Sequence, residues 1–131
     1  MVNNVELFSD AKASMALSPR AREERLKRAK EKYDADTSSL EAMLAYAEAL
    51  FDNHRFAEAE DMLRMAVETD PSNADVLYNL AFVFALNGKE EKAKEAYHQV
   101  IQLSPGTSLA KSAEYELWKM GEHIEARWLR K

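Results

Sequence analysis

The sequence has 131 residues, of which 47% are apolar and 31% charged, with a formal net charge of −5 and no cysteine. Such a composition fits one globular domain, and the absence of thiols excludes disulfides, thiolate zinc sites and cysteine-ligated iron–sulfur clusters. No apolar run approaches the ~18 residues of a membrane span, and the first residues lack the basic end and apolar core of a secretory signal, so we expect a cytoplasmic protein.

The N-terminal segment predicts two helices. Apolar residues recur at helical spacing over residues 4–17, for example Val5, Phe8 and Met15. Ser18 and Pro19 then provide an N-cap and a proline at the first helical position, which predicts a second helix over about residues 19–33. Residues 1–38 are therefore expected to form an N-terminal helix pair.

The middle of the chain predicts four more helices, over about residues 40–51, 56–69, 74–86 and 90–103. Asp70 and Ser104 each precede a proline and end a helix, because the residue before proline avoids the α region. Asn87-Gly88 predicts a turn in which glycine takes the left-handed conformation.

These helices repeat. The interval from Pro71 to Pro105 equals the interval from Ala59 to Ala93. A period of this length, about 34 residues, indicates a solenoid, in which each unit buries its apolar face against the next. A third copy follows, with helices expected over residues 108–120 and from about 122; Ala126 falls one residue short of a full period after Ala93, so this copy has lost one residue. The expected units are 39–73, 74–106 and a shortened 107–131.

The pattern resembles the tetratricopeptide repeat family, most closely over residues 39–106. Counting from Leu40 and from Ala74, the family's apolar and proline positions are occupied as follows: Met43, Tyr46, Ala47, Leu50, Ala59, Leu63, Ala66 and Pro71 in one repeat, and Leu77, Leu80, Ala81, Phe84, Ala93, Tyr97, Val100 and Pro105 in the next. The resemblance implies an all-α, right-handed superhelix of antiparallel helix pairs, with residues 1–38 as a degenerate capping unit. His54 stands where the second repeat has Gly88, so we expect a left-handed backbone there.

The resemblance also places the first helix of each pair on a concave groove and implies exposed positions along it. The candidate groove residues are Leu44, Glu48, Phe51, Tyr78, Asn79, Phe82, Leu86, Tyr115 and Trp118. Such an apolar and aromatic strip indicates a binding surface for an amphipathic helix or extended peptide of another protein. Two alternatives stay open: the strip is ordinary core, or the helix over residues 4–17 fills the groove.

The acidic residues on the expected groove helices indicate the charge of the ligand. Glu41, Glu48, Asp52 and Asp75 on the same helices favour a ligand that carries some positive charge. Some members of the family bind the C-terminal carboxylate of heat-shock chaperones with a clamp of basic and amide side chains. Asn79 matches one clamp position, but no basic pair accompanies it, so no such clamp is predicted.

Residues 20–32 form a basic stretch in an otherwise acidic chain. The simplest interpretation is a solvated helix face. It also suits contact with an acidic protein, including another copy in a self-assembling scaffold, and more remotely a nucleic acid.

Catalysis finds no support in the sequence. His54, His98 and His123 lie in separate units without metal-ligand spacing, and no glycine-rich phosphate loop or nucleophile motif is present. We therefore predict a non-catalytic protein-interaction module, an adaptor, scaffold or chaperone-like protein, without a metal or cofactor.

Overall fold

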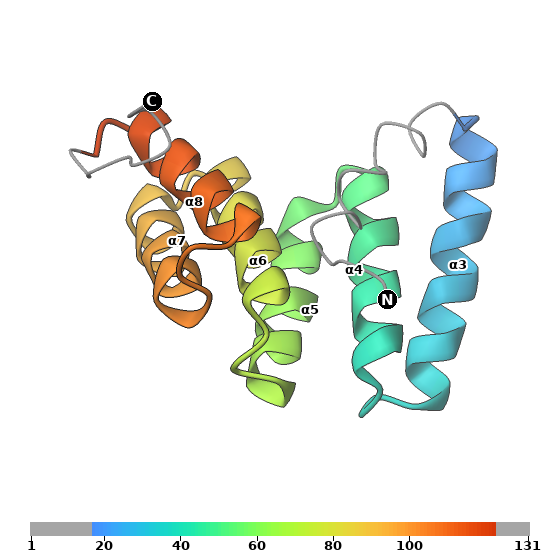
Figure 1. Ribbon diagram of the computed structural model, residues 1–131. Coiled ribbons are helices and arrows are strands. Elements are labelled where there is room, and N and C mark those ends of the chain that lie inside the picture. Colours follow the sequence, from blue (N-terminus) through green and yellow to red (C-terminus); the bar gives the residue numbers. More distant parts are fainter. Residues whose placement is uncertain (1–16, 123–131) are drawn as a thin grey trace.

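The computed structural model describes residues 17–122, which form six helices and no strand (Figure 1). The helices are α3 (Pro19–Ala35), α4 (Leu40–Asp52), α5 (Phe56–Thr69), α6 (Ala74–Leu86), α7 (Glu90–Leu103) and α8 (Ser108–Lys119). The predicted all-α fold is confirmed for this part of the chain. The helices expected over residues 4–17 and from about 122 lie almost entirely outside the described residues.

The helix bounds follow the sequence closely. Those of α5, α6 and α7 agree with the prediction, whereas α4 ends one residue later and α8 one residue earlier than expected. Helix α3 continues for two residues beyond Tyr33. Within this extension the Asp34 carboxylate pairs with Lys30 one turn earlier at 2.8 Å, an arrangement that adds slightly to helix stability.

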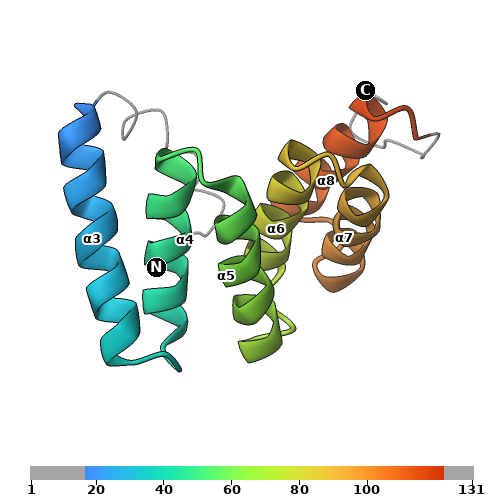
Figure 2. The same ribbon diagram turned by 180° about the vertical axis from the view of Figure 1, so that it is seen from behind.

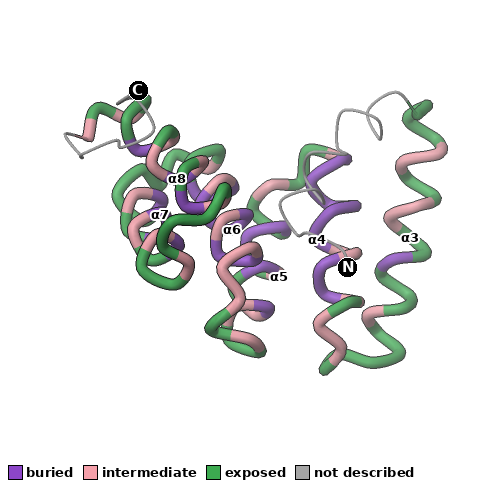
Figure 3. The backbone as a smooth tube through the Cα atoms, in the orientation of Figure 1, coloured by how far each residue is buried: buried purple, intermediate pink, exposed green. Residues whose placement is uncertain are grey.

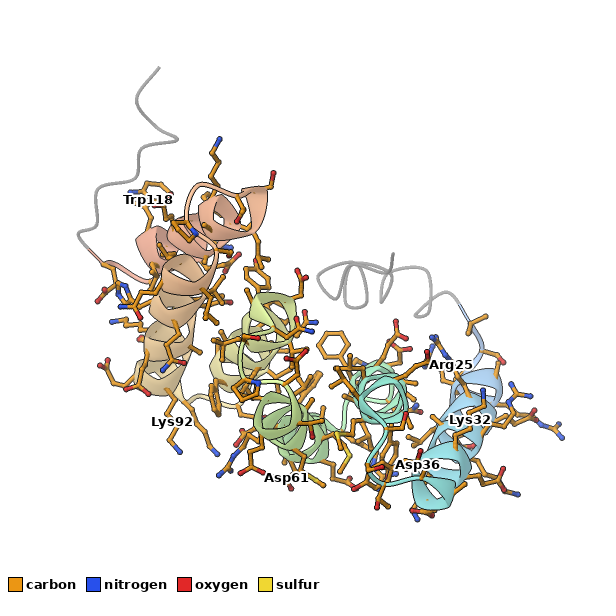
Figure 4. The ribbon with its side chains drawn as sticks, turned by 60° about the horizontal axis from the view of Figure 1, so that its bottom comes forward. Arg25, Lys32, Asp36, Asp61, Lys92 and Trp118 are labelled. Carbon is orange, nitrogen blue, oxygen red and sulfur yellow. The ribbon has the colours of Figure 1, made fainter. Side chains whose placement is uncertain are left out.

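The helices form an arc with two layers. In Figure 4, α4, α6 and α8 lie on the inner side of the arc, and α3, α5 and α7 lie on the outer side. Each helix packs against the next one along the chain, and α6 also contacts α8. The view from behind shows the same order, with α3 at one end and α8 at the other (Figure 2).

Capping residues define where the inner helices begin. The side chains of Ser39, Asn73 and Thr107 each accept a hydrogen bond from a backbone N–H in the first turn of α4, α6 and α8 respectively. Ser18 does the same for α3, ahead of Pro19. These side chains satisfy backbone donors that a helix N-terminus leaves without a partner, so the start of each inner helix is encoded locally.

The core follows the repeat. Of the apolar residues at the family positions in the two repeats, every one except the half-buried Tyr46 is buried. Ala47, Ala59, Ala81 and Ala93 are fully inaccessible to solvent, which lets the two helices of each pair approach closely. The buried residues of α4 lie between Met43 and Asp52, whereas α3 has a single buried residue, Ala29 (Figure 3).

A repeated hydrogen bond joins neighbouring helix pairs. The Asn53 side chain donates to the backbone carbonyl of Arg22 at 3.1 Å, and the Asn87 side chain donates to that of Phe56 at the same distance. Asn53 and Asn87 stand one repeat period apart, and so do their acceptors. Each repeat is thus held to the preceding outer helix by one amide at its turn.

The turns carry the expected left-handed residues. The φ angle is 59° at His54, 77° at Gly88 and 86° at Gly121. The first interval between these residues is a full repeat period, and the second is one residue shorter. The prediction for His54 is therefore confirmed. A left-handed backbone at a residue with a Cβ costs about 1 kcal/mol, which glycine avoids.

We expect His54→Gly to raise the free energy of unfolding by about 0.5–1 kcal/mol, because glycine adopts this conformation without steric cost. The measurement is thermal unfolding, with a rise in Tm of about 3 °C. Gly88→Ala is the matched reverse change: a Cβ there has open space around it, so any loss reports the backbone alone. Equal stability of all three proteins would contradict the prediction.

Candidate functional site

The nine candidate groove residues lie on the three inner helices, but their exposure differs along the arc. Leu86, Tyr115 and Trp118 are 45%, 41% and 49% exposed. Tyr78 and Phe82 are half-buried. The remaining four are buried, namely Leu44, Glu48, Phe51 and Asn79, and the expectation that these are exposed is wrong. The open part of the strip is therefore at the α6–α8 end.

Packing explains why the apolar residues on α4 are not accessible. Leu44 and Phe51 belong to the continuous core of the repeats. The Phe51 ring packs against Phe56 of α5 at 5.4 Å and against Phe82 of α6 at 6.0 Å, centroid to centroid. Phe51 and Phe82 thus link two adjacent inner helices, and for this pair the structure agrees with the core interpretation.

Two of the three acidic residues on α4, Glu48 and Asp52, are paired with a side chain from α3. Arg25 donates to Glu48 Oε1 at 2.8 Å and to Asp52 Oδ2 at 3.1 Å. Glu48 is 7% exposed and Asp52 only 1%. The expectation that these two carboxylates attract a cationic ligand is therefore wrong. Arg25 belongs to a different helix and is distant from both carboxylates in sequence, so no local pattern could assign this partner.

The accessible apolar side chains at the α8 end of the arc include Tyr78 and Leu86 of α6 and Tyr115 and Trp118 of α8, and these four are called the aromatic platform here. The Tyr115 and Trp118 rings stack with centroids 6.0 Å apart and an interplanar angle of 27°. Lys119 lies over the Tyr115 ring, with its Nζ 4.8 Å from the centroid. The platform thus combines apolar surface with a cation at its edge.

A shallow cavity of about 290 Å³ adjoins the platform between α6 and α8. It is lined by Tyr78, Lys111, Ser112, Tyr115 and Glu116. Burial, together with the nearby Glu116 carboxylate, raises the pKa of Tyr78 to about 12. The phenol is protonated at neutral pH, as it would be at its usual pKa of 10.0, and it can donate a hydrogen bond as well as accept one. Sequence reasoning did not single out Glu116, which no repeat position marks.

The register of α8 is what turns Tyr115 and Trp118 outward. The buried residues of α8 stand one residue less than a full period after the buried residues Leu77, Leu80 and Phe84 of α6; they are Ala110, Ala113 and Leu117. The residue lost from the third copy therefore falls near the start of α8. As a result, the buried face of α8 is shifted by one residue relative to the repeat. The remaining faces of α8 hold the exposed aromatic rings.

In the part of the chain that the structure describes, none of the helices combines the length and apolar character needed to cross a membrane. Within residues 17–122, no three histidine or acidic side chains gather in a way that could hold a metal ion.

Comparisons with known proteins agree with this architecture. Residues 50–114 match a tetratricopeptide repeat family model. The crystal structure of MamA superposes with a TM-score of 0.68 at 29% identity, over 91% of this chain and 70% of MamA. An arc of antiparallel helix pairs that repeat along the chain defines a helical repeat protein of the protein-interaction class. The chain belongs to the tetratricopeptide repeat family.

Two curated relatives are photosystem I assembly proteins named Ycf3. The protein from Rippkaea orientalis (strain PCC 8801 / RF-1) is 39% identical over 74 residues, which are 56% of this chain and 38% of the relative. The protein from Acaryochloris marina (strain MBIC 11017) is 45% identical over 42 residues, which are 31% of this chain and 25% of the relative. The chain thus spans less than two fifths of the length of either relative.

Proposed function

We propose that this protein binds a segment of a partner protein on the aromatic platform and holds it without catalysing a reaction. The observation that carries the proposal is the exposure of three large apolar side chains, Leu86, Tyr115 and Trp118, on the inner helices α6 and α8. Exposed apolar clusters usually mark interaction sites, and tryptophan and tyrosine contribute most to binding at such sites.

The platform suits a helix or extended peptide with one or two apolar anchors. Trp118 and Leu86 offer apolar contact, and the protonated Tyr78 hydroxyl offers a hydrogen bond. Lys111 and Glu116, both lining the cavity, supply one charge of each sign. The ligand's specificity therefore comes from shape and hydrogen bonding more than from net charge.

The relatives support a role in assembly. The two Ycf3 proteins are named for the assembly of photosystem I. We infer for this chain an adaptor or assembly role of the same general kind, in which the platform holds a partner's exposed segment. The absence of a catalytic motif in the sequence supports a function through binding alone.

Site-specific photo-crosslinking tests this function. A photo-reactive amino acid replaces Tyr115 on the platform, and in a second protein it replaces Leu103, which is equally exposed at the end of α7 on the outer side of the arc. We expect irradiation in the source cells to link one defined protein to position 115 and not to position 103. The same products at both positions, or none at 115, would overturn the proposal.

A further inference from the structure

A second surface of distinct chemistry lies at the opposite end of the arc from Trp118, where Figure 4 labels Arg25 and Lys32 on α3. A cavity of about 220 Å³ opens there between α3 and α4. Its lining is Arg25, Arg28, Ala29 and Lys32 of α3 with Ala45 and Glu48 of α4. We call this the α3 pocket. Three of its four charged side chains are basic.

The three cations of the α3 pocket differ in what they contact. Arg25 is held by the two buried carboxylates, Glu48 and Asp52. Arg28 and Lys32 are exposed, and no ion pair within 4.0 Å joins either of them to another described residue. They stand four residues apart, which places them on the same face of α3, one turn from each other.

Two other basic residues of α3 pair with carboxylates of the same helix. Arg20 pairs with Glu24 at 3.6 Å, and Lys30 pairs with Asp34 at 2.8 Å. Arg28 and Lys32 beside the cavity therefore carry positive charge that no described carboxylate within 4.0 Å neutralises, and Lys27, outside the pocket lining, does so as well. An anion that enters the α3 pocket would meet the guanidinium group of Arg28 and the ammonium group of Lys32. The apolar part of the lining is formed by Ala29 and Ala45.

The charge of the surrounding chain limits which anion fits. Residues 19–35 carry seven basic and four acidic side chains, whereas residues 36–122 carry seven basic and sixteen acidic ones. A long polyanion such as a nucleic acid would extend over that acidic surface and be repelled. Aromatic rings for base stacking are also absent from the pocket lining, and the nearby Tyr33 is stacked on Tyr46.

We propose that the α3 pocket is a second protein-binding surface, which takes a short run of Asp and Glu side chains from a partner. One carboxylate lies between Arg28 and Lys32, and the apolar stems of the acidic side chains lie on Ala29 and Ala45. Because the pocket is separate from the aromatic platform, this proposal stands or fails independently of the platform.

The test is the binding of a fluorescent octaglutamate peptide, followed by anisotropy at low ionic strength. Arg28→Gln combined with Lys32→Gln is expected to weaken binding about tenfold, because two charge-assisted contacts are lost. Arg20→Gln combined with Lys27→Gln is the matched control, since it removes one arginine and one lysine charge from exposed positions of α3 outside the pocket lining. We expect less than a twofold change there.

Three outcomes overturn the proposal. If both double variants weaken octaglutamate binding equally, the peptide responds only to the overall charge of α3 and not to the pocket. No binding of octaglutamate by the unaltered protein means that the pocket takes no acidic segment. Tighter binding of an oligothymidine of equal charge, lost in the pocket variant, assigns the surface to nucleic acid. Trp118→Ala must leave octaglutamate binding unchanged, which separates this surface from the platform.

Discussion

Replacing Arg25 with alanine is expected to lower the free energy of unfolding by about 2–3 kcal/mol. The substitution removes the guanidinium that bridges two buried carboxylates, Glu48 and Asp52, at 2.8 and 3.1 Å. Removing one partner of a buried ion pair typically costs about 3–5 kcal/mol, and the value expected here is lower because the Arg25 side chain is 37% exposed. Urea unfolding at neutral pH, followed by circular dichroism, measures the change.

Lys27→Ala is the control for Arg25→Ala. Lys27 is exposed on the same helix and makes no ion pair with another described residue, so its loss is expected to change stability by less than about 0.5 kcal/mol. Arg25→Met separates the charge from the packing of the side-chain stem. A loss for Arg25→Ala that does not exceed the Lys27→Ala loss would mean that α3 is not held to α4 by this ion cluster.

Replacing Trp118 with alanine is expected to weaken binding of the partner at the platform by about thirtyfold. A central tryptophan in an interface often contributes about 2 kcal/mol or more, which corresponds to that ratio. Stability should change little, because Trp118 is 49% exposed and the buried residues of α8 are Ala110, Ala113 and Leu117. The affinity for the partner identified by cross-linking is measured by calorimetry.

Leu86 and Leu103 provide a matched pair for this experiment. Their exposures are 45% and 44%, but Leu86 ends the inner helix α6 and Leu103 ends the outer helix α7. Leu86→Ser should weaken partner binding at least fivefold, and Leu103→Ser should leave it within error. These variants test the platform more cleanly than a charge at Phe82, whose half-buried ring packs on Phe51. Equal effects at positions 86 and 103 would place the partner elsewhere.

Acid should weaken the contact between the two complete repeats. Glu60, 3% exposed, accepts hydrogen bonds from Lys89 Nζ at 2.7 Å and Asn87 Nδ2 at 2.9 Å. Although burial alone raises its pKa, these hydrogen bonds and the Lys89 charge hold the pKa of Glu60 below its usual 4.5. The stabilisation is therefore complete above that value and is lost as pH falls through the lowered pKa.

We expect Glu60→Gln to lose about 1–2 kcal/mol of unfolding free energy at neutral pH and to match the unaltered protein more closely in acid, where Glu60 is protonated. Urea titrations on both sides of the lowered pKa measure this difference. Glu58→Gln is the control, because the Glu58 side chain is 49% exposed and pairs only with Arg55 of the adjoining turn among the residues described. A pH-independent difference for Glu60→Gln would contradict the prediction.

The sequence was sufficient to predict the helices, the repeat and the family, because the residues that determine where each helix begins and ends act locally. N-caps at Ser39 and Asn73 act within one helical turn, and Pro71 and Pro105 end helices through their neighbours. The repeat period then predicts that the same positions are buried in each repeat, as Ala47 and Ala81 are. Caps, prolines and the repeat period can all be recognised without knowing which other helix packs against the one in question.

Exposure along the inner face depended on the tertiary structure. Glu48 and Tyr115 occupy the same position of the repeat in the first and third copies, so the sequence predicts the same exposure for both. In the structure Glu48 is buried and paired with Arg25, whereas Tyr115 is exposed. Likewise, the basic stretch on α3 was predicted as a feature separate from the groove, although Arg25, Arg28 and Lys32 meet Glu48 in one pocket. The physical reason is that burial and charge pairing are set by side chains that approach from other helices, here distant in sequence, and no periodicity encodes that approach.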